Sequence, residues 1–363
     1  MTIKNIQRAI PSAVATVILG IAPFAAATAA QTDIAALATT QAVQAWHEQV
    51  KEDGPPAEGC WSVSYPSRIW TAERCNAAPN YRSIPPSPTS TGHSRITRST
   101  SLSGSLVSAK AGAGVDYSAV TASLTRSATG SFPTVTGVTS ESGALGANKY
   151  TLQLNTNTSD DVVNLGNTSP YCAANGYAAC STWEQFIYST DNGSNNPQVF
   201  IQNWLFVGPG DSCPRGWQSF NTSEYQGCFT NSQAVAVPNV PASSLGSVKL
   251  AGSATANGND TVTFTNGTKV YAISQRDSTL QIASTWNTSE FNVVGDGSNS
   301  PAANFNRGSS ITVKLAVNDG STRVPSCLGP NGGGTTGEYN NLTLGRCTTS
   351  GGATPFIQFT ESN

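Results

Sequence analysis

The sequence predicts an all-β protein, built as a sandwich or a barrel, that follows a short helical segment near the N-terminus. From about residue 106 onward, short β-prone runs alternate with turns rich in Gly, Asn and Asp. Helical periodicity is nearly absent from this part of the chain, and many short strands at such spacing are typical of a sandwich or barrel. No fixed-period repeat is present, which disfavours a propeller or a solenoid.

Residues 1–30 have the pattern of a signal peptide. Lys4 and Arg8 provide a basic start, residues 13–27 are largely apolar, and small residues around Ala29 offer a cleavage site. A transmembrane anchor is the alternative, but the prolines and many alanines of this segment make a poor spanning helix. We therefore expect a secreted, extracellular protein without a membrane span after processing, with the periplasm as an alternative location.

Residues 31–105 are expected to form a helix, a small disulfide module and a linker. Apolar residues recur at helical spacing from Asp33 to Glu52, and Gly54 with the two following prolines ends that helix. The module runs from Cys60 to Cys75, and the residues after about 83 are rich in Pro, Ser and Thr, as extended linkers are. We expect this region to be separable from a sandwich domain of residues 106–363, and it is a candidate propeptide.

The eight cysteines predict four local disulfides. Their number is even, and each cysteine has a neighbour close in sequence, which in an oxidising compartment favours pairing between neighbours. The expected pairs are Cys60 with Cys75, Cys172 with Cys180, Cys213 with Cys228, and Cys327 with Cys347.

The composition excludes several kinds of chemistry. Charged residues make up 11% of the chain, against about 25% in an average soluble protein, which argues against a nucleic-acid partner. The two histidines, His47 and His93, both precede the β-rich region, which removes Ser-His, Cys-His and His-metal sites there. We expect no metal and no cofactor, and a monomer. Carboxylates and amides must then perform any catalysis.

Two strand-like runs have one face that combines aromatic, amide and carboxylate side chains. In residues 198–207 the odd positions are mostly apolar and predict a core face, whereas the even positions mix aromatic and amide side chains. Residues 286–294 show the same contrast. We expect the mixed faces to line a substrate cleft, with a second hydrophobic core as the alternative. The residues predicted to line the cleft are Phe200, Gln202, Trp204, Trp286 and Asn292.

Several segments occur in the order seen in one family of secreted peptidases. These segments are Ser131–Gly137, Trp183-Glu184-Gln185-Phe186, Asp191-Asn192-Gly193-Ser194, Phe200–Phe206, Thr265-Asn266-Gly267-Thr268 and Trp286–Val293. In this order they resemble the opening strand, the Gln strand, a turn, an aromatic strand, a second turn and the Glu strand of the glutamic peptidases of the eqolisin type. The Trp-x-Gly-Ile-Asp-Gly segment that precedes the Gln in that family is absent here.

This resemblance implies a fold, an activity and two catalytic residues. The fold would be a concanavalin A-like β-sandwich of the jelly-roll type. Glu290 would act as the general base that activates water for attack on a peptide bond, and Gln185 would position that water and stabilise the oxyanion. The substrate would be a polypeptide, and activity would be acidic and independent of metal.

Two other functions remain open at the level of sequence. A glycosidase would use two carboxylates across an aromatic cleft, for which Glu184 and Glu290 are available, although Glu184 should face away from Gln185. A carbohydrate-binding, lectin-like sandwich without catalysis would use exposed aromatic and amide side chains to bind glycans.

Overall fold

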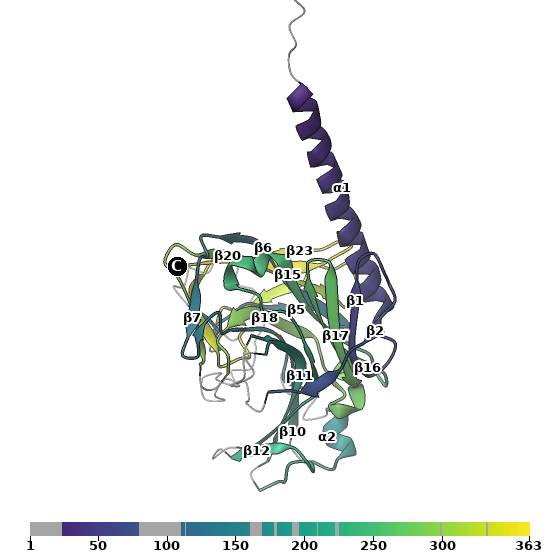
Figure 1. The fold of residues 1–363 in the computed structure, drawn as a ribbon. Helices are drawn as coiled ribbons and strands as arrows, with labels where there is room; N and C mark the ends of the chain where they lie inside the picture. The colour runs from purple at the N-terminus through teal and green to yellow at the C-terminus, as the bar shows by residue number, and fades with distance from the viewer. Residues whose placement is uncertain are drawn as a thin grey trace, which may run out of the picture. The chain divides into compact units, whose positions relative to one another are not determined.

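A computed structural model describes residues 24–79, 110–112, 114–159, 169–177, 180–190, 196–208, 210–221, 225–297, 300–331 and 333–363 (Figure 1). The chain divides into two compact units, Met1–Ala45 and Trp46–Asn363. In the first unit, the described residues belong to helix α1 (Phe24–Asp53), which begins earlier than the helix predicted from Asp33. Most of the predicted signal peptide and the predicted Pro/Ser/Thr linker lie outside the described residues.

None of the helices among the described residues combines the length and the apolar character needed to cross a membrane.

The last turns of α1, which belong to the second unit, pack through one face. Trp46 and Val50 lie one turn apart and are buried against Val63 and Val270. The helix ends at Gly54, whose φ of 60° is in the left-handed region that glycine adopts at little cost.

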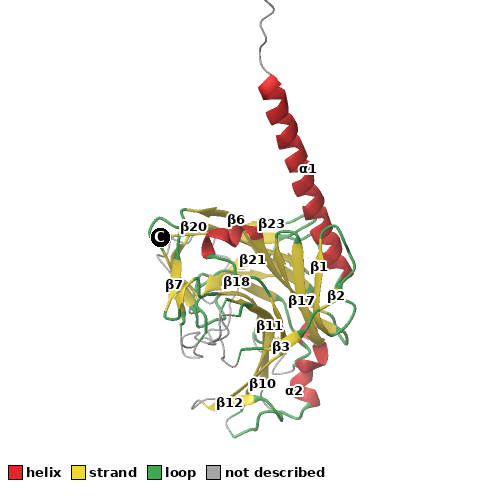
Figure 2. Ribbon diagram, in the orientation of Figure 1, coloured by secondary structure: helices red, strands yellow, loops and turns green. Residues whose placement is uncertain are grey.

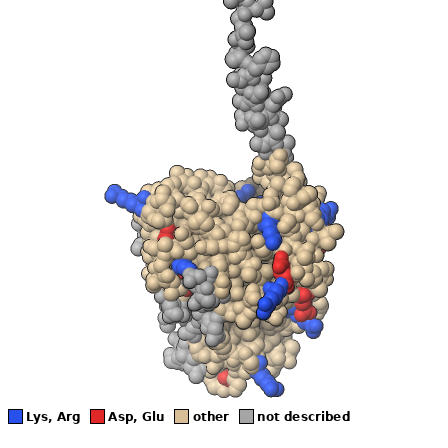
Figure 3. Space-filling model, in the orientation of Figure 1, with Lys and Arg blue, Asp and Glu red and all other residues tan. Residues whose placement is uncertain are grey.

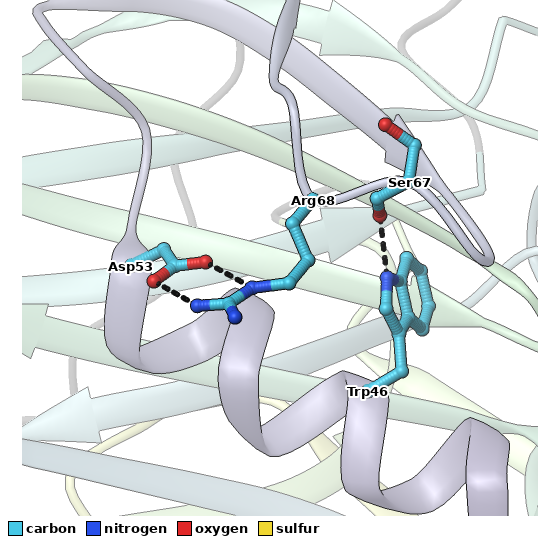
Figure 4. Close-up of polar contacts among 4 residues, drawn as sticks. All are labelled: Trp46, Asp53, Ser67 and Arg68. Carbon is cyan, nitrogen blue, oxygen red and sulfur yellow. Dashed lines mark hydrogen bonds and ion pairs between the residues drawn. The ribbon is translucent and has the colours of Figure 1, made fainter.

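Polar contacts reinforce this packing (Figure 4). The indole N–H of Trp46 donates to the carbonyl of Ser67 at 2.5 Å. Arg68 donates twice to the Asp53 carboxylate, at 2.8 and 2.6 Å. This bidentate contact lowers the pKa of Asp53 and holds the loop that contains Arg68 against the helix end.

The strands form two sheets (Figure 2). In space, the larger sheet runs in the order β2-β1-β17-β16-β15-β6-β20-β24-β22-β19-β7-β8, with β4 and β23 attached beside it. Its strands are β1 (Gly59–Ser64), β2 (Thr71–Ala72), β4 (Lys110–Gly112), β6 (Ser127–Thr136), β7 (Glu141–Gly143), β8 (Gly146–Ala147), β15 (Val248–Ala254), β16 (Asn259–Asn266), β17 (Lys269–Arg276), β19 (Ala302–Phe305), β20 (Ser310–Asn318), β22 (Tyr339–Leu344), β23 (Thr348–Ser350) and β24 (Phe356–Ser362).

The smaller sheet runs in the order β12-β13-β11-β10-β9-β18-β5-β21, with β14 also paired to β11 and β3 paired to β14. Its strands are β3 (Cys75–Ala77), β5 (Ser118–Val120), β9 (Thr151–Thr156), β10 (Cys180–Ser189), β11 (Gln198–Val207), β12 (Gln218–Asn221), β13 (Gln226–Asn231), β14 (Gln233–Ala236), β18 (Thr288–Val294) and β21 (Ser326–Leu328). Short helices complete the described structure: α2 (Pro170–Ala174), η2 (Ala242–Ser247), η3 (Asp277–Thr279) and η4 (Ile282–Ser284).

The two sheets pack face to face, so the predicted all-β sandwich is confirmed. Apolar side chains from the facing sides of the two sheets meet in one core between them. Val199 and Ile201 of β11 lie in this core, as the alternation in residues 198–207 predicts. The ring of Tyr188 stacks on that of Phe264 from the opposite sheet, with ring centroids 4.3 Å apart.

Two glycines of the larger sheet allow aromatic rings of the smaller sheet to approach its backbone. A Cβ atom at Gly130 would overlap the ring of Phe291, and one at Gly252 would overlap the ring of Phe186. Both rings belong to the strands that hold Gln185 and Glu290. Any larger residue at these glycines would push those strands away from the core.

The module from Cys60 to Cys75 is part of both sheets rather than a separate body. Its first strand, β1, pairs with β17 of the larger sheet over six residue pairs. Its last strand, β3, pairs with β14 of the smaller sheet. Residues 31–105 are expected to be separable from the sandwich, but β1 and β3 belong to its two sheets. An edge strand gains backbone hydrogen bonds and buries apolar surface when it joins a sheet.

The four predicted disulfides are all present. They join Cys60 to Cys75, Cys172 to Cys180, Cys213 to Cys228 and Cys327 to Cys347. The first joins β1 to β3, and thus the larger sheet to the smaller one. The last joins β21 of the smaller sheet to the residue that precedes β23 of the larger sheet.

Candidate active site

A row of polar side chains crosses the smaller sheet on the face turned away from the core. Adjacent strands pair so that six polar residues lie directly opposite one another, and directly opposed residues in antiparallel strands point to the same face. We call this set the polar row. Its members, in order across the sheet, are Asn231, Gln202, Gln185, Asn155, Glu290 and Ser118.

The two catalytic candidates from the sequence lie in this row, separated by a single strand. Gln185 on β10 and Glu290 on β18 both pair with Asn155 on β9. All three side chains are buried. The register therefore brings together two residues that are about a hundred positions apart in the chain.

The amide of Gln185 is held at both ends. Its Nε2 donates to the side-chain oxygens of Asn155 and Gln153, both at 3.1 Å. Its Oε1 accepts a hydrogen bond from the indole N–H of Trp204 at 2.8 Å. Because an indole N–H can only donate, this contact determines which end of the amide is the oxygen.

The carboxylate of Glu290 is held through one oxygen only. Its Oε2 accepts hydrogen bonds from Asn155 Nδ2 at 3.0 Å, from the backbone N–H of Thr335 at 2.8 Å, and from the Thr335 hydroxyl. Its Oε1 is buried and has no hydrogen-bond partner among the described residues. Burial raises the pKa of Glu290 above that of an ordinary glutamate, whereas the hydrogen bonds from Thr335 and Asn155 act in the opposite direction. The backbone N–H of Thr336 also lowers this pKa, although it makes no hydrogen bond of ordinary geometry with Oε1.

Two further carboxyl groups lie beside this site, joined by Asn292. The amide nitrogen of Asn292 donates to Asp116 at 2.7 Å and to Glu361 at 2.6 Å. Burial raises the pKa of Glu361 to about 7. Burial, together with the negative charges of Glu290 and Glu361, raises the pKa of Asp116 well above its usual range. These groups therefore retain protons at pH values where exposed carboxylates have lost them.

Four of the predicted cleft residues, Phe200, Gln202, Trp204 and Asn292, lie on the face of the polar row, where they are buried. Trp204 packs against Trp183 and Phe229, with ring centroids 5.7 and 5.3 Å away. Phe200 packs against Ile187 in a small apolar cluster. Gln202 donates to Asn231 at 2.8 Å.

Trp286 is placed differently from the prediction. It precedes β18 and lies in the main core, where its ring is 5.7 Å from that of Phe186. Its indole N–H donates to Ser289 Oγ at 3.0 Å. The prediction that Trp286 shares the face of Glu290 is therefore wrong, because alternation cannot be extended across the turn before a strand.

Glu184 lies on the core side of β10, opposite to Gln185. There it accepts a hydrogen bond from Gln275 of the larger sheet at 3.2 Å. Its pKa is raised to about 8 by burial and by the negative charge of Asp277. Glu184 and Glu290 therefore point to opposite faces of the smaller sheet and do not face a common substrate site.

Sequence reasoning missed the residues that connect the site. Asn155 could have been found, because Thr151, Gln153 and Asn155 alternate with two leucines along β9. The sequence carries no such signal for Thr335 or Asp116, which lie outside the strands and reach the site only through tertiary packing.

Comparisons with known proteins add little to this geometry. No family model and no curated protein sequence matches the chain. One solved structure is similar, the crystal structure of scytalido-glutamic peptidase with a transition state analog inhibitor, at 13% identity and a TM-score of 0.26, covering 70% of this chain and 97% of that one. A likeness at this level carries no argument about activity. Fold and site define a β-sandwich protein with a buried amide–carboxylate site on one sheet.

Proposed function

We propose that this protein is a secreted endopeptidase of the glutamic type, active at acidic pH, in which Glu290 and Gln185 form the catalytic dyad. One observation carries the proposal: both residues lie in the polar row, on one face of the smaller sheet, with Asn155 hydrogen-bonded to each. The sequence order that resembles the glutamic peptidases independently selects the same two residues.

The chemistry requires one proton to move twice. Oε1 of Glu290 removes a proton from a water molecule, whose oxygen then bonds to the carbonyl carbon of the substrate. The proton is next delivered from Glu290 to the amide nitrogen as the C–N bond breaks. The amide N–H of Gln185 would stabilise the negative oxygen of the intermediate. Since Nε2 already donates to Asn155 and Gln153, one of these two bonds must be exchanged for the bond to substrate.

The pH dependence follows from the carboxyl groups. Glu290 must be charged to act as a base, so its raised pKa sets the acidic limit of activity. Loss of protons from Glu361 and Asp116 at higher pH adds negative charge beside Glu290 and opposes the developing oxyanion. We therefore expect a bell-shaped profile that has declined by neutral pH.

The test is digestion of denatured casein by the purified protein from about pH 2 to about pH 7. Glu290→Gln should abolish digestion. Glu184→Gln, a change in a buried glutamate of the opposite sheet face, should leave it intact where the variant unfolds at the same temperature as the wild type. EDTA should have no effect. Retention on immobilised glycans without any proteolysis would replace this proposal with the carbohydrate-binding alternative.

A further inference from the structure

We propose that Oε1 is the oxygen of Glu290 that exchanges the proton, and that Asn155 and Thr335 are positioning residues that hold Oε2. This inference rests on the proposed function, which it deepens. It assigns different roles to the two oxygens of one carboxylate and to two residues outside the dyad.

The distribution of hydrogen bonds separates the two oxygens. Oε2 accepts three bonds, one from Asn155 and two from Thr335, and these bonds occupy its lone pairs. Oε1 is buried without a partner among the described residues. A buried polar atom of a native site that lacks a partner calls for a ligand or a water molecule. Oε1 therefore has free lone pairs to accept a proton, and Oε2 does not.

Thr335 is held in place by its neighbours in the chain. The carbonyl of Gly333 accepts a hydrogen bond from the hydroxyl of Ser118, which also belongs to the polar row. The carbonyl of Thr336 accepts one from the backbone N–H of Gly114 at 3.0 Å. A Cβ atom at Gly334 would lie 2.7 Å from the backbone of Gly114, so the two backbones are in close contact. These contacts on both sides direct the N–H and hydroxyl of Thr335 at Glu290.

Asn155 couples the carboxylate to the catalytic amide. Its Nδ2 donates to Glu290, and its Oδ1 accepts from Gln185. A flip of the Asn155 amide would place N–H against N–H on one side and oxygen against oxygen on the other. The orientation fixed by Trp204 at Gln185 is thereby passed on to Glu290.

The same bonds favour the charged form of Glu290. Burial alone would leave the carboxyl protonated over a wide pH range, and donors to a carboxylate oppose that shift. A residue that merely fills space contributes to the burial of Glu290 but donates no hydrogen bond to its charged form. Removal of either donor should therefore raise the pKa of Glu290 further and also lower the rate once Glu290 is charged.

The experiment compares Thr335→Val, Thr335→Ser and Asn155→Leu with the control Thr156→Val. Thr156 is a buried threonine of the same strand as Asn155, and its hydroxyl donates to the backbone carbonyl of Glu184 rather than to Glu290. The first readout is the carboxyl ¹³C titration of Glu290, assigned by its loss in Glu290→Gln. The second is the pH profile of casein digestion.

We expect the pKa of Glu290 to rise by roughly one unit in Thr335→Val and Asn155→Leu, and to return in Thr335→Ser. The rate at pH values where Glu290 is fully charged should fall roughly ten-fold in the same two variants. Unchanged titration in both, or an equal shift in Thr156→Val, would overturn the inference. A pKa shift with no loss of the plateau rate would also overturn the positioning role.

The two proposals fail separately. If the wild-type protein digests nothing at any pH, the proposed function fails, while the ¹³C titration still decides whether Asn155 and Thr335 hold the charged form of Glu290. If digestion is present and depends on Glu290 but the variants titrate like the wild type, only the present inference is lost.

Discussion

The orientation of the Gln185 side chain depends on Trp204, a residue that the sequence predicted to line the substrate cleft. Trp204 is buried, and its indole N–H donates to the amide oxygen of Gln185. It therefore orients the amide of Gln185, the proposed catalytic amide, rather than presenting an open aromatic surface. Since the amide has a donor end and an acceptor end, this single bond decides which of them faces Asn155.

Replacement of Trp204 by Phe should lower proteolysis roughly ten-fold and the free energy of unfolding by about 1–3 kcal/mol, because a buried amide oxygen loses its donor. Trp183→Phe is the matched control. The indole of Trp183 packs against that of Trp204 but donates to the backbone carbonyl of Thr156 at 2.9 Å. Thermal unfolding and kcat/KM should show a similar loss of stability in both variants and a loss of activity only in Trp204→Phe. Equal losses of activity would contradict the orienting role.

At the scale of elements, β10 carries the amide of Gln185 on one face and the buried carboxyl of Glu184 on the other. On its core face Glu184 lies near Asp260 of β16 and Asp277 of η3, and all three side chains are buried. The pKa of Asp260 is raised well above its usual range, first by burial and then by the negative charges of Glu184 and Asp277. Neither oxygen of Asp260 has a hydrogen-bond partner among the described residues, so no donor offsets the burial of its charge.

The cluster should favour folding at acidic pH. In the folded state Glu184 and Asp260 keep protons that the unfolded chain releases near pH 4, so stability falls as pH rises from about 4 through the folded pKa of Glu184, about 8. Asp260→Asn should therefore raise the free energy of unfolding at about pH 8 and change it little at about pH 4. Urea titrations at both pH values measure this. The exposed Glu52→Gln serves as the control, and a gain confined to acidic pH would contradict the assignment.

At the scale of the whole molecule, few charges are present on the surface and several carboxyls are buried. On the face drawn in Figure 3, charged side chains are sparse and scattered. Among the described residues, burial raises the pKa of Glu141 and of Glu184 to about 8 and that of Glu361 to about 7. Asp116, Asp260 and Glu290 are shifted in the same direction.

The melting temperature should accordingly be highest near or below about pH 4 and should fall steadily to about pH 8. Between these pH values each carboxyl with a raised pKa binds more protons in the folded state than in the unfolded state, so a rise in pH favours unfolding. Calorimetry or circular dichroism across this range tests the expectation. A melting temperature that rises toward neutral pH, as in proteins stabilised by ion pairs, would show that these carboxyls do not control stability.

The pairing of β1 and β3 with both sheets bears on the proposed propeptide. Cleavage at a protease site inserted near residue 95 should leave the Cys60–Cys75 module bound, because β1 pairs with β17 and β3 with β14. Size-exclusion chromatography followed by mass spectrometry should find both fragments together at neutral pH. Release of the module on acid treatment, accompanied by a rise in proteolysis, would instead support a propeptide.

The sequence by itself determined the features that depend on local pattern. Alternation along residues 198–207 identified the core face of β11, and short spacing identified the four disulfides, because both are set by neighbours in the chain. Only the tertiary structure decided which residues meet. The alignment of Gln185 and Glu290 on Asn155 is a matter of strand register, and a slip by one residue would turn Glu290 into the core. The approach of Thr335 and Asp116, and the position of Trp286 in the core, likewise arise from packing between distant segments, which no local pattern encodes.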